Sequence, residues 1–384
     1  MRKPTLFVLL LLSPLLLFLV NLNLNLPTFY TLTILWVGVL LGATLNFFQY
    51  GFSSSFRSLI LERRTVGMRA IVVMLGVAIL LFAPLLALGS WGEQSYSGFI
   101  RALSLAVPIG AFIFGVGMQI GCGCTSGTLN RAGQLQALSI STLFFIIIGG
   151  TLAAFSYASW SNLPALEPFA FQTEFGWILG LVIQLSLLTG LYLLLRKLEQ
   201  KRHQHSATPY QSLLSLRGKN NNNHAFLWAA ISLAVLNGSL LLITGVPWSI
   251  SSIFPYWGSS LIDLLGLPID WRFWDYSIEN TIRLNQSFLE NSVSLTALGL
   301  LLGAFLVSLL RPKVKIALTK DRLIASVFGG LLMGYGAVMA SGCNIGALFS
   351  GIASGSLHGW VWLLFALFGN ILGLAIRKRL VNAE

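Results

Sequence analysis

Charged residues are scarce in this chain. They make up 9% of its 384 residues, while hydrophobic residues make up 55%. A soluble globular protein carries about 25% charged residues, so most of the surface of this protein does not face water. The composition therefore excludes a soluble domain and predicts an integral membrane protein whose main partner is the lipid bilayer.

Cysteine is rarer still, with Cys122, Cys124 and Cys343 as the complete set. This small, odd number excludes a disulfide framework, and no pair has the C-x-x-C spacing of thiol redox enzymes. The Cys122-Gly-Cys124 spacing could hold a soft metal ion, but no histidine lies nearby and there is no second pair. A G-x-x-x-x-G-K-[ST] nucleotide motif is also missing. We therefore predict no metal, no cofactor and no enzymatic activity.

Acidic residues are outnumbered by basic residues, 12 against 24, which gives a formal net charge of +12. In a soluble protein this balance would point to nucleic acid. Here the basic residues stand in short stretches between apolar runs, which is the pattern of cytoplasmic loops in membrane proteins. The charge therefore predicts an orientation in the membrane and no nucleic-acid partner.

Apolar runs long enough to cross a hydrocarbon core of roughly 30 Å recur along the chain. They predict an all-α membrane protein with about ten transmembrane or half helices. The segments lie near residues 5–26, 29–48, 67–89, 102–120, 137–158, 175–195, 225–245, 288–310, 323–340 and 358–376. The first segment follows Met1-Arg2-Lys3 and has no small-residue cleavage site after it, which favours a retained helix over a signal peptide.

The basic clusters fit ten spans with both termini in the cytoplasm. All of them then fall on the cytoplasmic side, at residues 2–3, 57–69, 131, 196–219, 311–320 and 377–379. The exceptions are Arg101, Arg272 and Arg283. Arg272 and Arg283 could raise the anion concentration at the outer face, or they could be ordinary surface arginines. Trp248 and Trp257 are expected to be interfacial anchors.

A polar linker at residues 197–224 divides the chain into two membrane units, residues 1–196 and 225–384. It contains His203, His205 and His224 and the asparagine run 220–223. Three scattered histidines could bind a metal, although polar filler is the simpler interpretation.

The two halves share one motif. Residues 115–129 read GVGMQIGCGCTSGTL and residues 334–348 read GYGAVMASGCNIGAL, and both fit G-x-G-x-x-x-x-x-G-C-x-x-G-x-L. The copies pair Cys124 with Cys343, and further glycine matches extend the register at Gly110/Gly329 and Gly150/Gly369. Because the copies follow segments of opposite direction, they predict an inverted-topology repeat with a substrate site at glycine-broken, re-entrant helices.

The chemistry of the motif fits an anion path. Glycine permits a sharp turn, and a helix that restarts after the turn offers free N–H groups and partial positive charge. We expect Cys124 and Cys343 on related turns that face a central pathway. The residues expected to complete this path are Gly123, Gly127, Gly342, Gly346, Thr125, Ser126 and Asn344. Alternatively, the glycines only allow tight helix packing and the cysteines are small filler.

Cys122 has a weaker case than the other two cysteines. Its counterpart in the second copy is Ser341, so the repeat does not support a role for its thiol. Its participation in the path stays open.

These motifs resemble the YeeE/YedE family of bacterial sulfur transporters. The resemblance rests on Gly115–Gly133, on S-G-C-N-I-G at residues 341–346 followed by Gly351, and on the stretch from Gly245-Val-Pro-Trp248 through Trp257-Gly258. It implies a bacterial inner-membrane protein that takes up thiosulfate, with some members linked to selenium metabolism. It also implies that Cys124 and Cys343 line the path and that a cytoplasmic sulfur-carrier protein is a candidate partner.

The chain departs from the family at one predicted path residue. Ser53, within Gln49-Tyr-Gly-Phe-Ser53, stands where the family motif has a cysteine. A hydroxyl still donates a hydrogen bond, but it is less polarizable than a thiol. The substrate is therefore thiosulfate or another sulfur or selenium species. A membrane thiol oxidoreductase and an accessory subunit that hands sulfur to a partner are the competing hypotheses.

Overall fold

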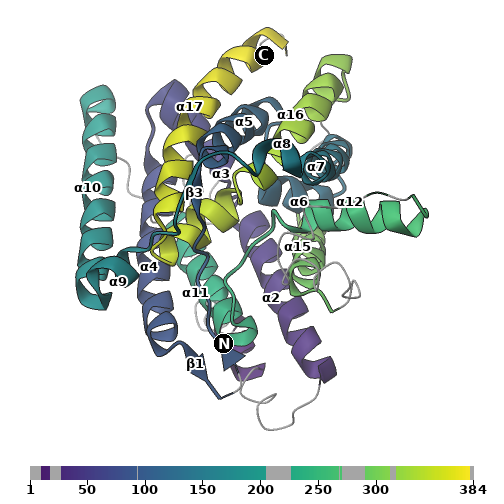
Figure 1. Cartoon of the computed structure of the whole chain (residues 1–384). Coiled ribbons are helices and arrows are strands. Elements are labelled where there is room, and N and C mark those ends of the chain that lie inside the picture. Colours follow the sequence, from purple (N-terminus) through teal and green to yellow (C-terminus); the bar gives the residue numbers. More distant parts are fainter. Residues whose placement is uncertain are drawn as a thin grey trace.

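The computed structural model describes residues 10–17, 27–92, 94–204, 226–267, 269, 290–311 and 317–380. It is almost entirely helical (Figure 1). The helices are α2 (Pro27–Phe47), α3 (Phe52–Arg57), η1 (Ser58–Glu62), α4 (Val66–Leu88), α5 (Ala106–Ile120), α6 (Thr125–Gly133), α7 (Ala137–Phe155), α8 (Tyr157–Trp160), α9 (Phe171–Phe175), α10 (Trp177–His203), α11 (Phe226–Thr244), α12 (Ile253–Leu264), α15 (Ser292–Ser308), α16 (Lys320–Met339), η3 (Asn344–Gly351) and α17 (Leu357–Leu380), where η marks a π-helix. Two short antiparallel pairs complete it, β1 (Ser90–Trp91) with β2 (Gln94–Ser95) and β3 (Leu103–Ser104) with β4 (Ala165–Leu166).

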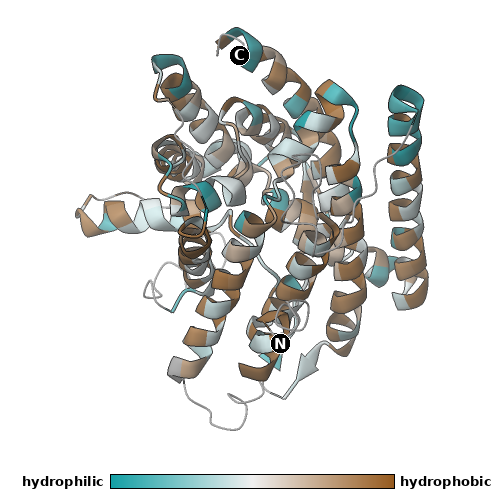
Figure 2. Ribbon diagram, turned by 180° about the vertical axis from the view of Figure 1, so that it is seen from behind, coloured by the Kyte–Doolittle hydropathy of each residue, from teal (hydrophilic) through white to brown (hydrophobic). Residues whose placement is uncertain are grey.

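The described residues contain eight helical segments that are long and apolar enough to cross a membrane. A shorter apolar helix, Ser292–Ser308, accompanies them. Hydrophobic residues cover the lengths of the helices, and hydrophilic residues gather at helix ends, most densely at the upper end of the view (Figure 2). The prediction of an all-α, multi-pass membrane protein is confirmed.

The crossing of α5 and α16 is a point of very close backbone contact. Gly110 of α5 faces Gly336 of α16, and Gly117 faces Gly329, so the two helices run antiparallel. At each position a Cβ would overlap backbone atoms of the other helix. Small residues are what allow such contact between membrane helices, so these glycines fix the crossing.

Each of these two helices has a parallel neighbour. Gly369 and Gly373 of α17 meet the backbone of Phe112 and Val116 on α5. In the same way, Gly334 of α16 meets the backbone of α7. These directions agree with spans that alternate along the chain, because α5 and α17 then run one way and α7 and α16 the other.

A third glycine-mediated pair joins the two halves of the chain. A Cβ on Gly42 of α2 would overlap the carbonyl oxygen of Leu300, and a Cβ on Gly303 of α15 would overlap that of Val39. The numbering increases together on both helices, so α2 and α15 are parallel. The N-terminus of α15 is capped by the side chain of Asn291. Its Oδ1 accepts hydrogen bonds from the N–H groups of Val293 and Ser294 at 3.1 and 3.0 Å.

The loops gather at two faces. At the face that we call the far face, Ser97 N donates to Gly245 O at 2.8 Å, and Phe171 N donates to Gly355 O at 3.0 Å. At the other, which we call the basic face, Arg311 donates to the carbonyl of Phe47. The basic face carries the arginine-rich helix ends and the end of α17, at the top of Figure 1.

A buried ion pair ties the peripheral helix α10 to α4. An Nη of Arg69 lies 2.6 Å from Glu199 Oε2, and Thr65 Oγ1 donates to the same oxygen at 3.0 Å. The two charged side chains are 2% and 4% exposed. Because α10 stands at the edge of the molecule (Figure 1), this pair is a principal polar link between it and the rest of the bundle.

Some predicted features lie outside the described residues. These are most of the first apolar segment, most of the 197–224 linker, Arg272 and Arg283. The prediction that Trp248 anchors at the membrane interface is wrong, because its side chain is 2% exposed. Its ring lies edge-on to that of Phe349, with 6.4 Å between the centroids, and its carbonyl accepts a hydrogen bond from the Ser350 hydroxyl at 2.6 Å. Trp248 therefore belongs to the packing around η3.

Candidate functional site: paired cysteines at two broken helices

Both copies of the motif form a helix, a break and a second helix. In the first, α5 ends at Ile120 and α6 begins at Thr125; in the second, α16 ends at Met339 and η3 begins at Asn344. The backbones of Cys122 and Ser341, which occupy matching positions, adopt left-handed φ angles of 61° and 50°. Such angles are uncommon for residues other than glycine. The two breaks therefore share an unusual local turn.

Cys124 is the N-cap residue of α6. Its Sγ accepts a hydrogen bond from the N–H of Gly127 at 3.3 Å and lies 3.3 Å from the hydroxyl of Ser126. The side chain is 1% exposed. The thiol is thus held at the end of a helix that carries partial positive charge, inside the protein.

Cys343 is the matching N-cap residue of η3 and is fully buried. Its Sγ lies near the N–H groups of Ile345 and Gly346, the hydroxyl of Thr125 and, farther off, Cys124. Thr125 comes from the first copy of the motif. The structure therefore brings the two copies together at one place, with Cys124, Thr125 and Cys343 as its members.

Apart from the approach of Thr125 to the Cys343 thiol, several polar atoms around the cysteines have no hydrogen-bond partner in the described structure. They are Thr125 Oγ1, Thr128 Oγ1 and both polar atoms of the Asn344 amide, and all three residues are 0% exposed. A buried polar group without a partner costs about 1–3 kcal/mol. Such groups beside two buried thiols are suited to hydrogen-bond a small polar guest.

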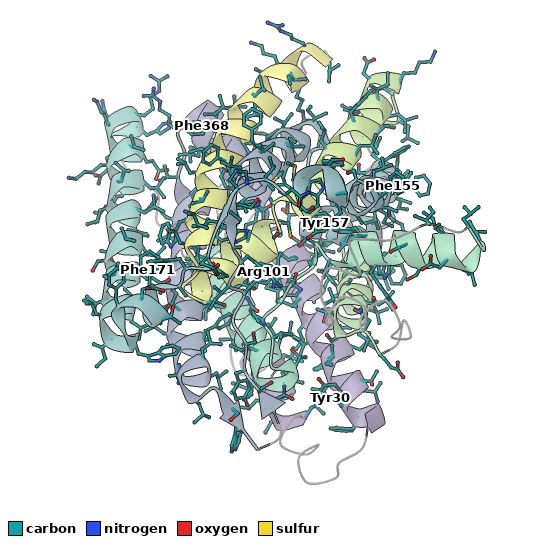
Figure 3. All side chains as sticks on the ribbon, viewed as in Figure 1. Tyr30, Arg101, Phe155, Tyr157, Phe171 and Phe368 are labelled. Carbon is teal, nitrogen blue, oxygen red and sulfur yellow. The ribbon has the colours of Figure 1, made fainter. Side chains whose placement is uncertain are left out.

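The four predicted path glycines permit close approach of other groups. A Cβ on Gly123 would strike the Arg131 guanidinium, and one on Gly342 would overlap the backbone of Ala347. A Cβ on Gly346 would lie 3.1 Å from the Phe99 ring. The guanidinium of Arg101 lies over the Phe99 ring, 4.7 Å from its centroid. Arg101 is labelled near the centre of Figure 3.

Gly127 differs from the other three, because a Cβ there would meet only the Cys124 sulfur, at 3.4 Å. This glycine leaves the thiol uncovered on the α6 side. Among the four, it is therefore the one whose role concerns the cysteine most directly.

Two glycine contacts bear on the register of the predicted repeat beyond the cysteines. Gly149 of α7 meets the carbonyl of Leu331, and Gly369 of α17 meets the carbonyl of Phe112. Leu331 and Phe112 are matching positions in the register of the motif. Under the predicted inverted repeat Gly369 would therefore correspond to Gly149, whereas the sequence register pairs it with Gly150. On that prediction the second copy is one residue longer, and the wider turns of the π-helix η3, where the first copy has α6, would accommodate the extra residue.

Ser53 and Cys122 lie on the basic-face side of this centre. The Ser53 hydroxyl donates to the carbonyl of Met118 at 3.3 Å, so α3 packs against the end of α5. Cys122 is half-buried, and its thiol is 3.7 Å from the carbonyl of Ile120. Neither side chain shares the hydrogen bonds around Cys124.

Sequence reasoning missed the residues that surround Cys122. Gln119 is 0% exposed; its amide donates to Asn370 Oδ1 at 2.6 Å and to Ser53 O at 3.2 Å. Arg57 and Arg377 both donate to Gln119. The signal that could have found Gln119 and Asn370 is a lone amide inside a long apolar run, which is rarely placed there without a partner.

The comparisons with known proteins agree on one family. A family model described as sulphur transport matches residues 49–372. The probable transporter YedE of Escherichia coli is 32% identical over 159 residues, which is 39% of each chain. The thiosulfate transporter TsuA of Spirochaeta thermophila is 28% identical over 349 residues, 88% of this chain and 96% of that one. TsuA of Escherichia coli is 23% identical over 273 residues, 69% and 72% of the two chains.

The resemblance drawn from the motifs is therefore confirmed, and the family and its named relatives are transporters rather than enzymes. The match spans about two fifths of the YedE relative, with 39% of its length aligned.

Proposed function

This chain belongs to the sulphur-transport family, and on that premise we propose that it carries thiosulfate, or a closely related small sulfur anion, across the bacterial inner membrane. The substrate passes through a central path on which Cys124 and Cys343 are the principal residues. No reaction alters it on the way.

The observation that carries this proposal is the meeting of two buried thiols with unpartnered donors. Cys124 and Cys343 cap two helix starts, and the Thr125 hydroxyl and Asn344 amide beside them have no partner in the described structure. Two helix N-termini of about half a positive charge each offset part of the charge of a dianion. The thiols and the hydroxyl supply donors without binding the anion so tightly that it cannot leave.

The arrangement is proposed to be an inverted repeat in which α5, α6 and α7 correspond to α16, η3 and α17. Support comes from paired contacts: Gly110 meets Gly336 as Gly329 meets Gly117. A two-fold rotation that superposes one repeat on the other would turn each of these two contacts into the other. A two-fold relation of this kind places a substrate site between the halves, where many inverted-repeat transporters have theirs.

The orientation follows from charge. The basic face is proposed to be cytoplasmic, with both termini on it, because cytoplasmic loops of membrane proteins are rich in lysine and arginine. A cytoplasmic sulfur-carrier protein is the proposed acceptor at the basic face.

The test is uptake of radiolabelled thiosulfate into liposomes that contain the purified protein alone. We expect Cys124→Ala and Cys343→Ala each to reduce initial uptake by roughly tenfold, since each removes a donor to a charged substrate. Ser239→Ala is the matched control, because the Ser239 hydroxyl donates to Val235 O within α11 at 3.0 Å, away from the cysteines.

Three other outcomes would each favour a different hypothesis. Uptake that persists in both cysteine variants would leave a transporter whose path does not use the thiols. Binding without uptake by the wild-type protein would favour an accessory subunit. Competition by selenite stronger than by unlabelled thiosulfate would move the substrate to selenium species, as the serine at Ser53 in place of a cysteine allows.

A further inference from the structure

Three arginines from distant parts of the chain converge around Cys122. Arg57 ends α3, Arg131 lies in the last turn of α6, and Arg377 lies in the last turn of α17. Arg57 lies close to Arg377, Arg131 and Cys122, and Arg131 lies close to Arg377, Cys122 and Cys124. Fold topology, not sequence proximity, brings these cations together.

Gln119 holds two of the three cations in place. Arg57 Nε donates to Gln119 Oε1 at 3.3 Å, and an Nη of Arg377 donates to the Gln119 carbonyl at 3.2 Å. The Gln119 amide is itself fixed by Asn370 Oδ1 at 2.6 Å. Each of these two guanidinium groups thus donates one N–H to Gln119. Because a guanidinium has five N–H groups, others are available to a bound anion.

Arg131 connects this cluster to the paired cysteines. Its guanidinium donates to the carbonyl of Cys122 at 2.6 Å and, through Nε, to that of Gly127 at 3.4 Å. It also lies directly against Gly123, where a Cβ would strike it. The Arg131 guanidinium therefore lies beside the break, hydrogen-bonded to the carbonyl two residues before Cys124.

These arginines differ from the ordinary basic residues of the same face. Arg63, Arg64 and Arg379 are exposed, whereas Arg57, Arg131 and Arg377 are half-buried. In the described part of the chain, none of the three forms an ion pair with a carboxylate; their partners are carbonyl and amide oxygens. Like charges held together and partly withdrawn from water repel one another, and a small dianion between them would relieve that repulsion.

We propose that Arg57, Arg131 and Arg377 form a second oxyanion site around the Cys122 thiol, which takes a small sulfur oxyanion after it has passed Cys124. The identity of the ligand rests on the proposed function, while the site itself rests on the arginines. Guanidinium groups bind such oxyanions through paired charge-assisted hydrogen bonds. The headgroup of an anionic phospholipid shares this chemistry, and the experiment must separate the two sources.

Cys122 provides the reporter. It is half-buried, while Cys124 and Cys343 are buried, so N-ethylmaleimide should modify Cys122 first, and a Cys122→Ala protein identifies the background. The protein is placed in nanodiscs of neutral phosphatidylcholine, and the modification rate is measured with and without inorganic sulfate. Sulfate is the oxygen analogue of thiosulfate and does not react with maleimide.

We expect sulfate to slow modification of Cys122 in the wild-type protein. Arg377→Gln should weaken this protection by roughly tenfold in sulfate concentration, because one charge-assisted hydrogen-bonding partner is lost. Arg377→Lys should restore part of it. Arg379→Gln, which removes the same charge from the exposed surface two residues along, should protect as the wild type does. Arg57→Gln serves as a second variant.

Three outcomes would overturn the inference. One is no protection by sulfate in the wild-type protein, and another is equal loss of protection in Arg377→Gln and Arg379→Gln. The third is protection that appears only when phosphatidylglycerol replaces part of the neutral lipid and that sulfate does not increase, since this would assign the arginines to a headgroup. Uptake without protection would sink this site alone, and protection without uptake would sink the proposed function alone.

Discussion

Replacement of Thr125 by valine should stabilise the protein and stop transport. Valine has the shape of threonine, with a methyl group in place of the hydroxyl, so the packing around Cys343 is preserved. Apart from the Cys343 thiol beside it, Thr125 Oγ1 is fully buried without a hydrogen-bond partner in the described structure. Because an unpartnered buried group costs about 1–3 kcal/mol, its removal should raise the free energy of unfolding by an amount in that range.

Thr142 supplies a matched control with the opposite expectation. It is 2% exposed, and its hydroxyl donates to Leu138 O at 2.8 Å and lies 2.8 Å from the hydroxyl of Ser326 on α16. Thr142→Val therefore breaks hydrogen bonds that are made and should lower the free energy of unfolding by about 1 kcal/mol. Its position on α7 keeps it out of the proposed path, so uptake should continue.

The assay measures the thermal unfolding midpoint in detergent and thiosulfate uptake on the same preparations. The two variants should shift the unfolding midpoint in opposite directions, and only Thr125→Val should lose uptake. If Thr125→Val lowers the midpoint as Thr142→Val does, its hydroxyl has a partner and is not available to a substrate. If Thr125→Val is more stable and still transports, the hydroxyl does not touch the substrate.

Two further predictions concern the bundle. Arg69→Ala should destabilise the protein by about 3–5 kcal/mol because it leaves Glu199 buried and unpaired, whereas Arg69→Met with Glu199→Leu should come close to the wild-type midpoint in the same thermal assay; a double variant as unstable as the single one would contradict this. Gly42→Ala should reduce the yield of folded, monodisperse protein on size exclusion, since its Cβ would overlap the carbonyl of Leu300, while Gly190→Ala, which meets nothing within 4 Å, should not; equal yields would show that α2 and α15 can separate freely.

The helices and the breaks between them could be predicted because their signals are local. Length and hydropathy mark a span within about twenty residues, and a cysteine flanked by glycines marks a turn within five. The left-handed φ angles at Cys122 and Ser341 were not predicted, because the pattern assigned the sharp turn to the glycines. The inverted relation between the halves rests on the same motif, and it stays a prediction.

The arginine cluster could not be predicted, because its members are far apart in the sequence. Arg57 and Arg377 are separated by most of the chain, and each is part of a basic stretch that charge rules explain without any site. Only the packing of α3 and α17 against the end of α5 brings both to Gln119. The one-residue shift at Gly369 was equally hidden, since an ungapped alignment does not show where a helix takes up an extra residue.

The two proposed sites differ in how completely they offset the charge of the substrate, and this difference has a consequence for direction. At Cys124 and Cys343 the compensation comes from two helix ends, about half a charge each, which together offset about one of the two charges of thiosulfate. Around Cys122 three full cations are available. An anion therefore gains electrostatic stabilisation as it moves from the thiols toward the basic face, and it must be removed there for transport to continue. A soluble acceptor of sulfur at that face would remove it, so the arginine site and the proposed carrier partner explain each other: one collects the anion, and the other keeps the site empty.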